Sequence, residues 1–123
     1  MILIDTSVWI DHLRASIPEL VTLLEEDQAA CHPWVRGELA LGSLKNRLDF
    51  LELLSLLPEI EMVTDRSVMA FIERNKLDQR DIGWVDVQLL AACIAWPCCI
   101  WTRDKCLKEI SIELGINWEK QDY

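Results

Sequence analysis

The chain has 123 residues, of which 51% are hydrophobic and 27% are charged. This length predicts one domain over residues 1–123, and the composition excludes a disordered or low-complexity protein. The formal net charge of −9 is unfavourable for nucleic-acid binding, which usually needs a basic face, but it suits a protein that binds divalent cations or a basic partner. No apolar run reaches the roughly 20 residues that span a membrane, and no targeting segment is visible, so we expect a cytoplasmic protein.

The five cysteines, Cys31, Cys93, Cys98, Cys99 and Cys106, are odd in number and form no C-x-x-C pair. Both features argue against a disulfide framework, and the two histidines are not placed to complete a zinc site with them. We therefore expect reduced cysteines that pack as small apolar side chains.

Short apolar runs alternate along the chain with segments of helical periodicity. The runs predict strands over residues 1–4, 29–31 and 98–102, with shorter ones over 60–63 and 116–118. The periodic segments predict helices over residues 8–14, 16–27, 33–44, 47–57, 67–77, 84–96 and 105–114. Because strands and helices alternate with short connections, we expect an α/β fold, a three-layer α/β/α sandwich with a central parallel sheet.

Several of the predicted helices carry signals at their ends. Ser16 and Glu19 have the spacing of a capping box, and Asp65 is placed to cap a helix that starts near Ser67. Gly115 is expected to close the last helix. Residues 84–96 are apolar almost all round, which predicts a helix buried within the domain.

Two of the predicted strands each lead into an aspartate. The run over residues 1–4 is followed directly by Asp5, and the run over 98–102 is followed by a short turn that contains Asp104. Strands buried on both faces of a parallel sheet read as continuous apolar runs of this kind. Because ligands bind beyond the carboxyl ends of parallel strands, Asp5 and Asp104 predict a shared acidic pocket.

Two further acids lie on predicted helices in apolar surroundings. Glu38 stands four residues after Trp34 and three before Leu41, so we expect it on the buried face that they share. Asp86 lies near the start of the apolar helix over 84–96. An ionised carboxylate in either place is costly unless it is paired or bound to a metal, which makes both acids candidates for the same pocket.

Simpler roles stay open for each of the four acids. The two strand-end aspartates are placed to cap the helices that follow them, and the helix dipole favours Asp86 near a helix N-terminus. Glu38 is close enough in sequence to pair with Arg36 or Arg47. Taken together the four favour a common site, since each of their segments is expected to reach the same end of the sheet.

Four converging carboxylates repel and raise one another's pKa, a cost that a bound cation removes. Mg²⁺ and Mn²⁺ prefer carboxylate and water oxygens, whereas zinc needs His or Cys ligands that the sequence does not offer here. One such ion can activate water while a second stabilises a leaving oxygen in phosphoryl chemistry. Thr6, Ser7 and Thr102 lie beside the strand-end aspartates and can orient ligands or water, or serve only in turns and caps.

Four sequence blocks in a fixed order are typical of one family. They are residues 4–14, Glu38 with the Leu-Gly-Ser at 41–43, residues 82–92 with Asp86, and residues 100–105 with Asp104. Over essentially the whole chain these blocks resemble a PIN-domain nuclease, specifically a ribonuclease toxin of the VapC type. Asp81 departs from the pattern, because similar sequences often have glycine at that position.

The resemblance implies an acidic cluster that holds one or two Mg²⁺ or Mn²⁺ ions and cleaves RNA, releasing a 3′-hydroxyl and a 5′-phosphate. Its members would be Asp5, Glu38, Asp86 and Asp104. Ser7 and Thr102 fall where the family places supporting hydroxyls. The resemblance also implies a homodimer, and a small cognate antitoxin whose basic C-terminal tail covers the acidic groove.

Four basic residues lie near the acidic blocks and are candidates for RNA phosphate contacts. They are Arg14, Arg36, Arg103 and Lys105. For each of them, solvated surface charge or an ion pair with a nearby acid is the alternative. Bound divalent ions would also partly neutralise the net charge of −9, which makes an acidic nuclease less unfavourable.

Two other functions stay open at this point. One is a phosphatase or phosphoacceptor that uses Asp5, although enzymes that form an aspartyl phosphate usually need a second acid where Ser7 stands here. The other is a non-catalytic interaction module that keeps the PIN-like fold only to bind a partner. The presence of all four acids argues against this second reading.

Overall fold

The computed structural model describes residues 1–119, and three short strands in it form one parallel sheet. β1 (Ile2–Ile4) lies in the middle, between β2 (Ala29–Ala30) and β3 (Cys99–Trp101). The first residue of β1 lies opposite the first residue of each neighbour. Because the strands run in one direction, the residues that follow β1 and β3 meet at the same edge of the sheet, as the sequence predicted.

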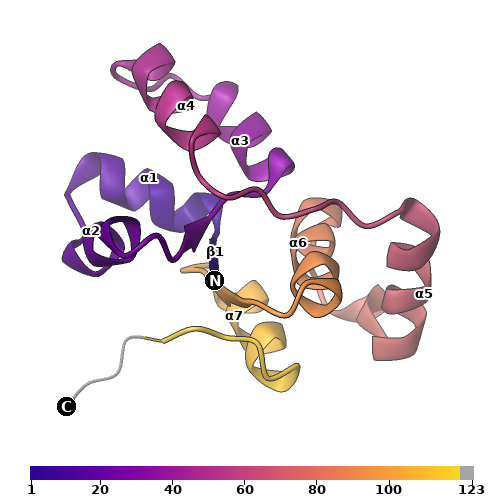
Figure 1. Cartoon of the computed structure of the whole chain (residues 1–123). Helices are drawn as coiled ribbons and strands as arrows, with labels where there is room; N and C mark the ends of the chain where they lie inside the picture. Colours follow the sequence, from indigo (N-terminus) through magenta and orange to yellow (C-terminus); the bar gives the residue numbers. More distant parts are fainter. Residues whose placement is uncertain (120–123) are drawn as a thin grey trace.

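Seven α-helices and one 3₁₀ turn accompany the sheet in the described part of the chain. They are α1 (Thr6–Arg14), α2 (Pro18–Glu25), α3 (Pro33–Ala40), α4 (Arg47–Ser55), α5 (Asp65–Asn75), η1 (Leu77–Gln79), α6 (Trp84–Ala95) and α7 (Lys105–Glu113). Figure 1 shows α1 and α2 to the left of β1 and α5 and α6 to its right, so helices flank the sheet on both sides. This is the predicted three-layer α/β/α arrangement. Within residues 1–119, every helix is too short or too polar to cross a bilayer.

The core lies between the sheet and the helices packed on it. The strand side chains Leu3, Ile4 and Ile100 are fully buried, and burial of one such side chain stabilises the fold by roughly 1.5–3 kcal/mol. Most of α6 is buried as well, as its apolar sequence predicted. Trp84 and Trp96 at the two ends of this helix stay 40% and 51% exposed.

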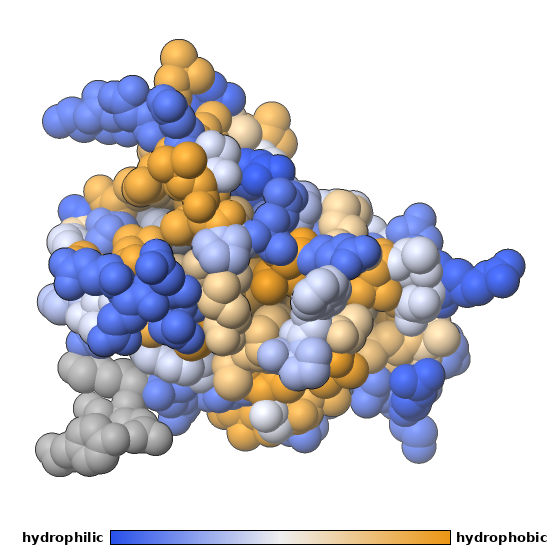
Figure 2. Space-filling model, viewed as in Figure 1, coloured by the Kyte–Doolittle hydropathy of each residue, from blue (hydrophilic) through white to orange (hydrophobic). Residues whose placement is uncertain are grey.

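Hydrophobic side chains also remain on the surface around α4. Leu48, Leu53 and Leu56 are 74%, 46% and 77% exposed, and Leu41, just after α3, is 90% exposed. Figure 2 shows apolar side chains on the surface in the upper part of the view, where α4 lies in Figure 1. Groups of exposed apolar side chains often mark a contact with another protein.

The strand predicted over residues 60–63 is wrong. The chain touches the sheet there through one bridge, in which Cys31 N–H donates to the Pro58 carbonyl and Ile60 N–H donates to the Cys31 carbonyl, both at 2.9 Å. Ile60 is buried, whereas Met62, two residues on, is 45% exposed. Side chains two apart on a strand share a face, so the chain has left the sheet directly after Ile60.

The last predicted strand, over residues 116–118, is reduced to a single bridge with β3. Ile100 N–H donates to the Ile116 carbonyl at 2.8 Å, and the Ile100 carbonyl accepts from Trp118 N–H at 2.9 Å. Gly115, directly before this segment, has a φ of +73°, in the left-handed region that glycine adopts without strain. It therefore ends α7 where the sequence predicted and turns the chain back toward β3.

The capping box predicted at Ser16 is also wrong. α2 begins at Pro18, its N-cap is Ile17, and no side chain caps it. The Ile17 N–H is instead taken by His12, whose Nδ1 accepts from it at 2.9 Å. A side chain from the preceding helix thus fixes the start of α2, and the nearby Ser16 plays no part in the cap.

α5 is capped one residue earlier than predicted. Thr64 rather than Asp65 is the N-cap, and its Oγ1 accepts from Ser67 N–H at 3.2 Å. α3 is shorter than predicted, because it ends at Ala40 and not near Leu44. The predicted helical period in these segments was correct, and the structure changes only where the helices begin and end.

Replacing Thr64 by Ala should lower the free energy of unfolding by about 1 kcal/mol, because it leaves the first turn of α5 without its side-chain acceptor. Ser16→Ala should change that free energy by less than about 0.5 kcal/mol, since Ser16 makes no cap. Urea unfolding of the two variants beside the parent chain measures both. An equal loss in the two variants would contradict the assignment of the caps.

Candidate active site

Asp5 lies at the end of β1, is only 5% exposed and collects hydrogen bonds on one oxygen. Its Oδ2 accepts from Ser7 Oγ at 2.6 Å, from Thr102 Oγ1 at 2.8 Å and, more weakly, from Ser7 N–H at 3.4 Å. The last bond makes Asp5 the N-cap of α1. The carboxylate therefore links the end of β1 to the residue that follows β3.

The two hydroxyls extend this link to the chain beyond β3. Ser7 Oγ accepts from Arg103 N–H, and Thr102 Oγ1 accepts from Asp104 N–H, each at 3.0 Å. Each hydroxyl thus donates to Asp5 and accepts from one backbone amide. Ser7 and Thr102 act as supporting hydroxyls in this network, and the turn that carries Asp104 is fixed against the start of α1.

Asp104 follows the same pattern as Asp5 at the next strand. Its Oδ1 accepts from Leu107 N–H at 2.9 Å, which makes Asp104 the N-cap of α7. Both strand-end aspartates therefore do cap helices, the simpler role that the sequence left open. Capping employs one oxygen of each side chain and leaves the negative charge at the carboxyl edge of the sheet.

Glu38 lies near the start of α1 through a bond with Thr6. Thr6 Oγ1 donates to Glu38 Oε1 at 2.9 Å, so the third predicted hydroxyl supports a different acid from the other two. The prediction of a buried face for Glu38 is wrong, because Glu38 and Leu41 are both exposed. The buried side chains of α3 are Val35 and Leu39, on the neighbouring face.

The two arginines close to Glu38 in the sequence have other partners. Arg36 forms an ion pair with Glu59, with Nη2 and Oε1 at 3.2 Å. Arg47 Nε donates to the Ala40 carbonyl at 2.8 Å. Neither arginine therefore neutralises the Glu38 carboxylate.

The pKa of Asp86 depends on the charges of all three other acids. Burial raises the pKa of this half-buried carboxyl to about 6, and the negative charges of Asp5, Asp104 and Glu38 add to the increase in that order. Coulombic effects weaken with separation, so charges that shift this pKa act from nearby. The structure thus brings the four predicted acids into one electrostatic cluster, which we call the acidic cluster (Asp5, Glu38, Asp86 and Asp104).

The donor chemistry of the acidic cluster fits a hard divalent cation. It offers carboxylate oxygens, the ligands that Mg²⁺ and Mn²⁺ prefer, and positive charge would relieve the repulsion that adds to the effect of burial on the pKa of Asp86. Within residues 1–119, however, no three His, Cys, Asp or Glu side chains are arranged as a ready-made cation site. The role of these four acids as metal ligands stays a prediction.

Two of the four basic candidates are ion-paired in the structure. Arg103 Nη1 lies 3.0 Å from Asp11 Oδ2, and Arg36 pairs with Glu59 as described. Arg14 lines a cavity of about 400 Å³ between α1 and the segment after α3. Lys105 is the first residue of α7, next to the acidic cluster.

Asp11 lies near the site, and the sequence analysis gave it no role. It stands four positions after Ser7 on α1, which places the two side chains on the same face of the helix. Its ion pair with Arg103 joins α1 to the turn after β3. The four-residue spacing from Ser7 was the feature of the sequence that could have placed Asp11 near the site.

Comparisons with known proteins identify the family of the chain. A model of the PIN domain matches residues 2–113. The chain therefore belongs to the PIN-domain family, and it is of the VapC type that the sequence blocks indicated. Ribonuclease VapC32 of Mycobacterium tuberculosis (strain CDC 1551 / Oshkosh) is 47% identical over 117 residues, 94% of this chain and 94% of the relative. Ribonuclease VapC32 of strain ATCC 25618 / H37Rv matches with the same identity and coverage.

Replacing Asp86 by Asn should stabilise the metal-free protein above about pH 6. The pKa of Asp86 is raised from 3.8 to about 6 in the fold, so below pH 3.8 the group is protonated in both states and costs nothing. As the pH rises through this window, the unfolded chain ionises first, and stability is lost until the folded pKa is passed. Because Asp86 is only half-buried, solvent screening reduces the electrostatic penalty, and we expect a gain of about 1–2 kcal/mol for Asp86→Asn at neutral pH that vanishes near pH 4.

The measurement is urea unfolding at several pH values in the presence of a chelator. Asp81→Asn is the matched control, since Asp81 is an exposed acid close in sequence to Asp86. A gain for Asp86→Asn that does not depend on pH, or one equal to that of Asp81→Asn, would show that the electrostatic penalty is absent.

Proposed function

We propose that this protein is a metal-dependent endoribonuclease, the toxin of a toxin–antitoxin pair. The observation that carries the proposal is the position of Asp86, a half-buried carboxyl whose pKa is raised first by burial and further by the negative charges of Asp5, Asp104 and Glu38. Membership of the PIN-domain family and 47% identity to proteins named as ribonucleases support the same reaction. The reaction is hydrolysis of RNA phosphodiester bonds by water.

Mg²⁺ or Mn²⁺ is the cofactor that suits the acidic cluster, and Asp5, Glu38, Asp86 and Asp104 would hold it. A bound ion of this kind lowers the pKa of water and stabilises the negative charge that develops on a phosphodiester. Cation binding would also relieve the repulsion that raises the pKa of Asp86.

The protein's own side chains would fix the geometry of the reaction. Ser7 and Thr102 hold Asp5 from two directions, and Thr6 holds Glu38, so these acids are oriented before a substrate arrives. Asp86, with a pKa of about 6, can exchange a proton near neutral pH. Its charge therefore responds to a nearby cation.

RNA would reach the acidic cluster past basic residues on α1 and α7. Arg14 and Lys105 are the candidates for phosphate contacts that lie outside the four ion pairs of the described chain. Arg36 and Arg103 can contribute only by leaving the acids with which they pair. Exposed ion pairs cost little to exchange, because each contributes about 0–1 kcal/mol.

We further propose that the chain acts as a single domain over residues 1–123 in the cytoplasm, as a homodimer neutralised by a small antitoxin. The net charge of −9 favours an antitoxin with a basic C-terminal tail. The exposed leucines around α4 offer an apolar contact surface for a partner. A short DNA-binding protein encoded directly upstream, which co-purifies with this chain and blocks its activity, would support this proposal, and a fully active complex would contradict it.

A phosphoacceptor role for Asp5 is the less favoured alternative. The side chain is 5% exposed and its Oδ2 already accepts from Ser7 and Thr102, which opposes attack on a phosphoryl group. Failure to trap a phospho-aspartate with a phosphate mimic, together with RNA cleavage, would exclude it. A non-catalytic module would bind the antitoxin but cleave nothing.

Asp5→Asn and Asp86→Asn should each reduce RNA cleavage by about 100-fold or more, because each removes a charge from the acidic cluster. The assay follows bulk RNA, tRNA and rRNA with Mg²⁺ or Mn²⁺, and again with a chelator, which should abolish cleavage by the parent chain. Asn retains the capping ability of Asp at position 5, and Asp86→Asn relieves rather than adds a folding cost.

Asp81→Asn is the control for this assay and should keep the parent activity, since Asp81 is exposed and lies outside the acidic cluster. Circular dichroism of all variants verifies that they are folded. Cleavage that survives the chelator, or equal cleavage by Asp86→Asn and the parent chain, would overturn the proposed function.

A further inference from the structure

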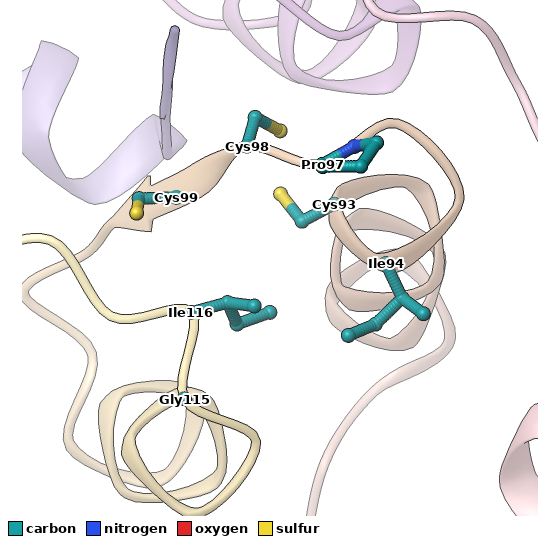
Figure 3. A pocket seen from close by; sticks show the side chains of 7 residues that line it. All are labelled: Cys93, Ile94, Pro97, Cys98, Cys99, Gly115 and Ile116. Carbon is teal, nitrogen blue, oxygen red and sulfur yellow. The ribbon is translucent and has the colours of Figure 1, made fainter.

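Three cysteines gather at the end of the sheet opposite to the acidic cluster. Cys93, Cys98 and Cys99 line a pocket of about 320 Å³ together with Pro97 and Ile116 (Figure 3). Cys93 belongs to the last turn of α6 and is 1% exposed, whereas Cys98, just before β3, and Cys99, the first residue of β3, are half-buried. The pocket thus gives a small molecule access to thiols near the protein interior.

Cys93 and Cys98 are in direct contact. The chain reverses between them, and Cys98 N–H donates to the Cys93 carbonyl at 3.3 Å. Figure 3 shows the two sulfur atoms pointing toward one another, while the sulfur of Cys99 points away from Cys93. The two thiols are close enough to affect each other's ionisation.

This contact makes the two thiols chemically unequal. The interaction between the two thiols lowers the pKa of Cys98 and raises the pKa of Cys93, which burial raises further. Cys98 is also the more exposed of the two. A low-pKa, accessible thiol beside a second, protonated thiol is the arrangement found where cysteines react reversibly with oxidants.

We propose that Cys93 and Cys98 form a peroxide-reactive thiol pair that closes an intramolecular disulfide. Hydrogen peroxide is the oxidant, Cys98 is the attacking thiol and Cys93 is the resolving thiol. The site lies apart from the acidic cluster, because Cys98 precedes β3 and Asp104 follows it. The proposal does not depend on the proposed function.

The reaction proceeds in two balanced steps. The Cys98 thiolate attacks one peroxide oxygen, an S–O bond forms, the O–O bond breaks, and the hydroxide released takes up a proton to become water. Cys98 is then a sulfenic acid. The Cys93 sulfur, on losing its proton, attacks the Cys98 sulfur, an S–S bond forms, the S–O bond breaks, and a second water leaves.

The remaining cysteines lack this combination of features. Cys31 is 1% exposed, and burial raises the pKa of its thiol to about 11, so it is largely protonated at neutral pH. Cys106 lies on α7, away from the pocket that the other three share. Cys99 lines the same pocket as the pair but points away from Cys93, which makes it the matched control.

The experiment treats the full chain, reduced and free of metal, with a small excess of hydrogen peroxide and follows intact mass and free thiols. The parent chain should lose two hydrogens and keep three of its five thiols. The three pocket cysteines lie between Arg80 and Arg103 and so share one tryptic peptide. The substitutions therefore identify the bonded pair.

Cys99→Ser should form the disulfide as fast as the parent chain. Cys93→Ser should stop at a sulfenic acid that a 1,3-dione traps on Cys98, and Cys98→Ser should lose thiols at least about tenfold more slowly. Because Cys98 is half-buried, Cys98→Ser keeps the core intact, so the comparison holds even where Cys93→Ser folds poorly.

Two results would overturn the proposal. One is a disulfide that survives in Cys98→Ser or disappears in Cys99→Ser, which would assign the bond to another pair. The other is a parent chain that gains only oxygen, or that links to a second chain, under conditions in which it stays folded by circular dichroism.

Discussion

One oxygen of Asp5 joins the ends of two neighbouring strands, and the site is built on this junction. Oδ2 accepts the hydroxyls of Ser7 and Thr102, and these in turn accept the amides of Arg103 and Asp104. Hydrogen bonds to a charged group contribute about 1.5–3 kcal/mol each, roughly twice as much as those between neutral groups. The position of Asp104 therefore follows from that of Asp5, although the two residues are far apart in the sequence.

The same junction sets the electrostatic problem of the fold. Once Asp5 and Asp104 are fixed at one edge of the sheet, any carboxyl brought to that edge is repelled, and Asp86 is brought there by the N-terminal turn of α6. The favourable helix dipole at that turn does not outweigh burial and the neighbouring charges, since the pKa of Asp86 is still raised to about 6. The concentration of negative charge at this edge therefore lowers the stability of the fold, as is expected at a functional site.

Much of this arrangement at the sheet edge was predictable, because it depends on the pattern of apolar and acidic residues within short stretches of sequence. The continuous apolar runs of β1 and β3 are typical of buried parallel strands, and parallel strands place Asp5 and the turn after β3 at one edge without further information. Hydroxyls next to those aspartates were also visible in the sequence. Their exact partners were not, because Thr6 supports Glu38 rather than Asp5.

The failures come from contacts that sequence spacing does not encode. Glu38 was assigned to a buried face because α3 has apolar residues on more than one side. In the structure the buried face of α3 is the one that carries Val35 and Leu39. The start of α2 was misassigned because the His12 ring, one helix earlier, takes the Ile17 amide. The contact between Cys93 and Cys98 depends on the chain reversal at the end of α6, so a count of cysteines could not show it.

The net charge of −9 argues against RNA binding by the chain as a whole, but the charges near the acidic cluster matter more than the total. Beyond a screening distance of about 8 Å at physiological salt, the chain as a whole repels RNA only weakly, so the charges close to the acidic cluster decide whether a phosphate can approach. There Arg103 and Arg36 are neutralised by Asp11 and Glu59, which leaves the acidic cluster less screened by its own arginines. On the proposed function, a divalent ion and a basic antitoxin tail would both bind the acidic cluster. The ion would attract RNA phosphates to this edge of the sheet, whereas the tail would block RNA from it. A strongly acidic chain serves both purposes better than a basic one, which would bind RNA without control.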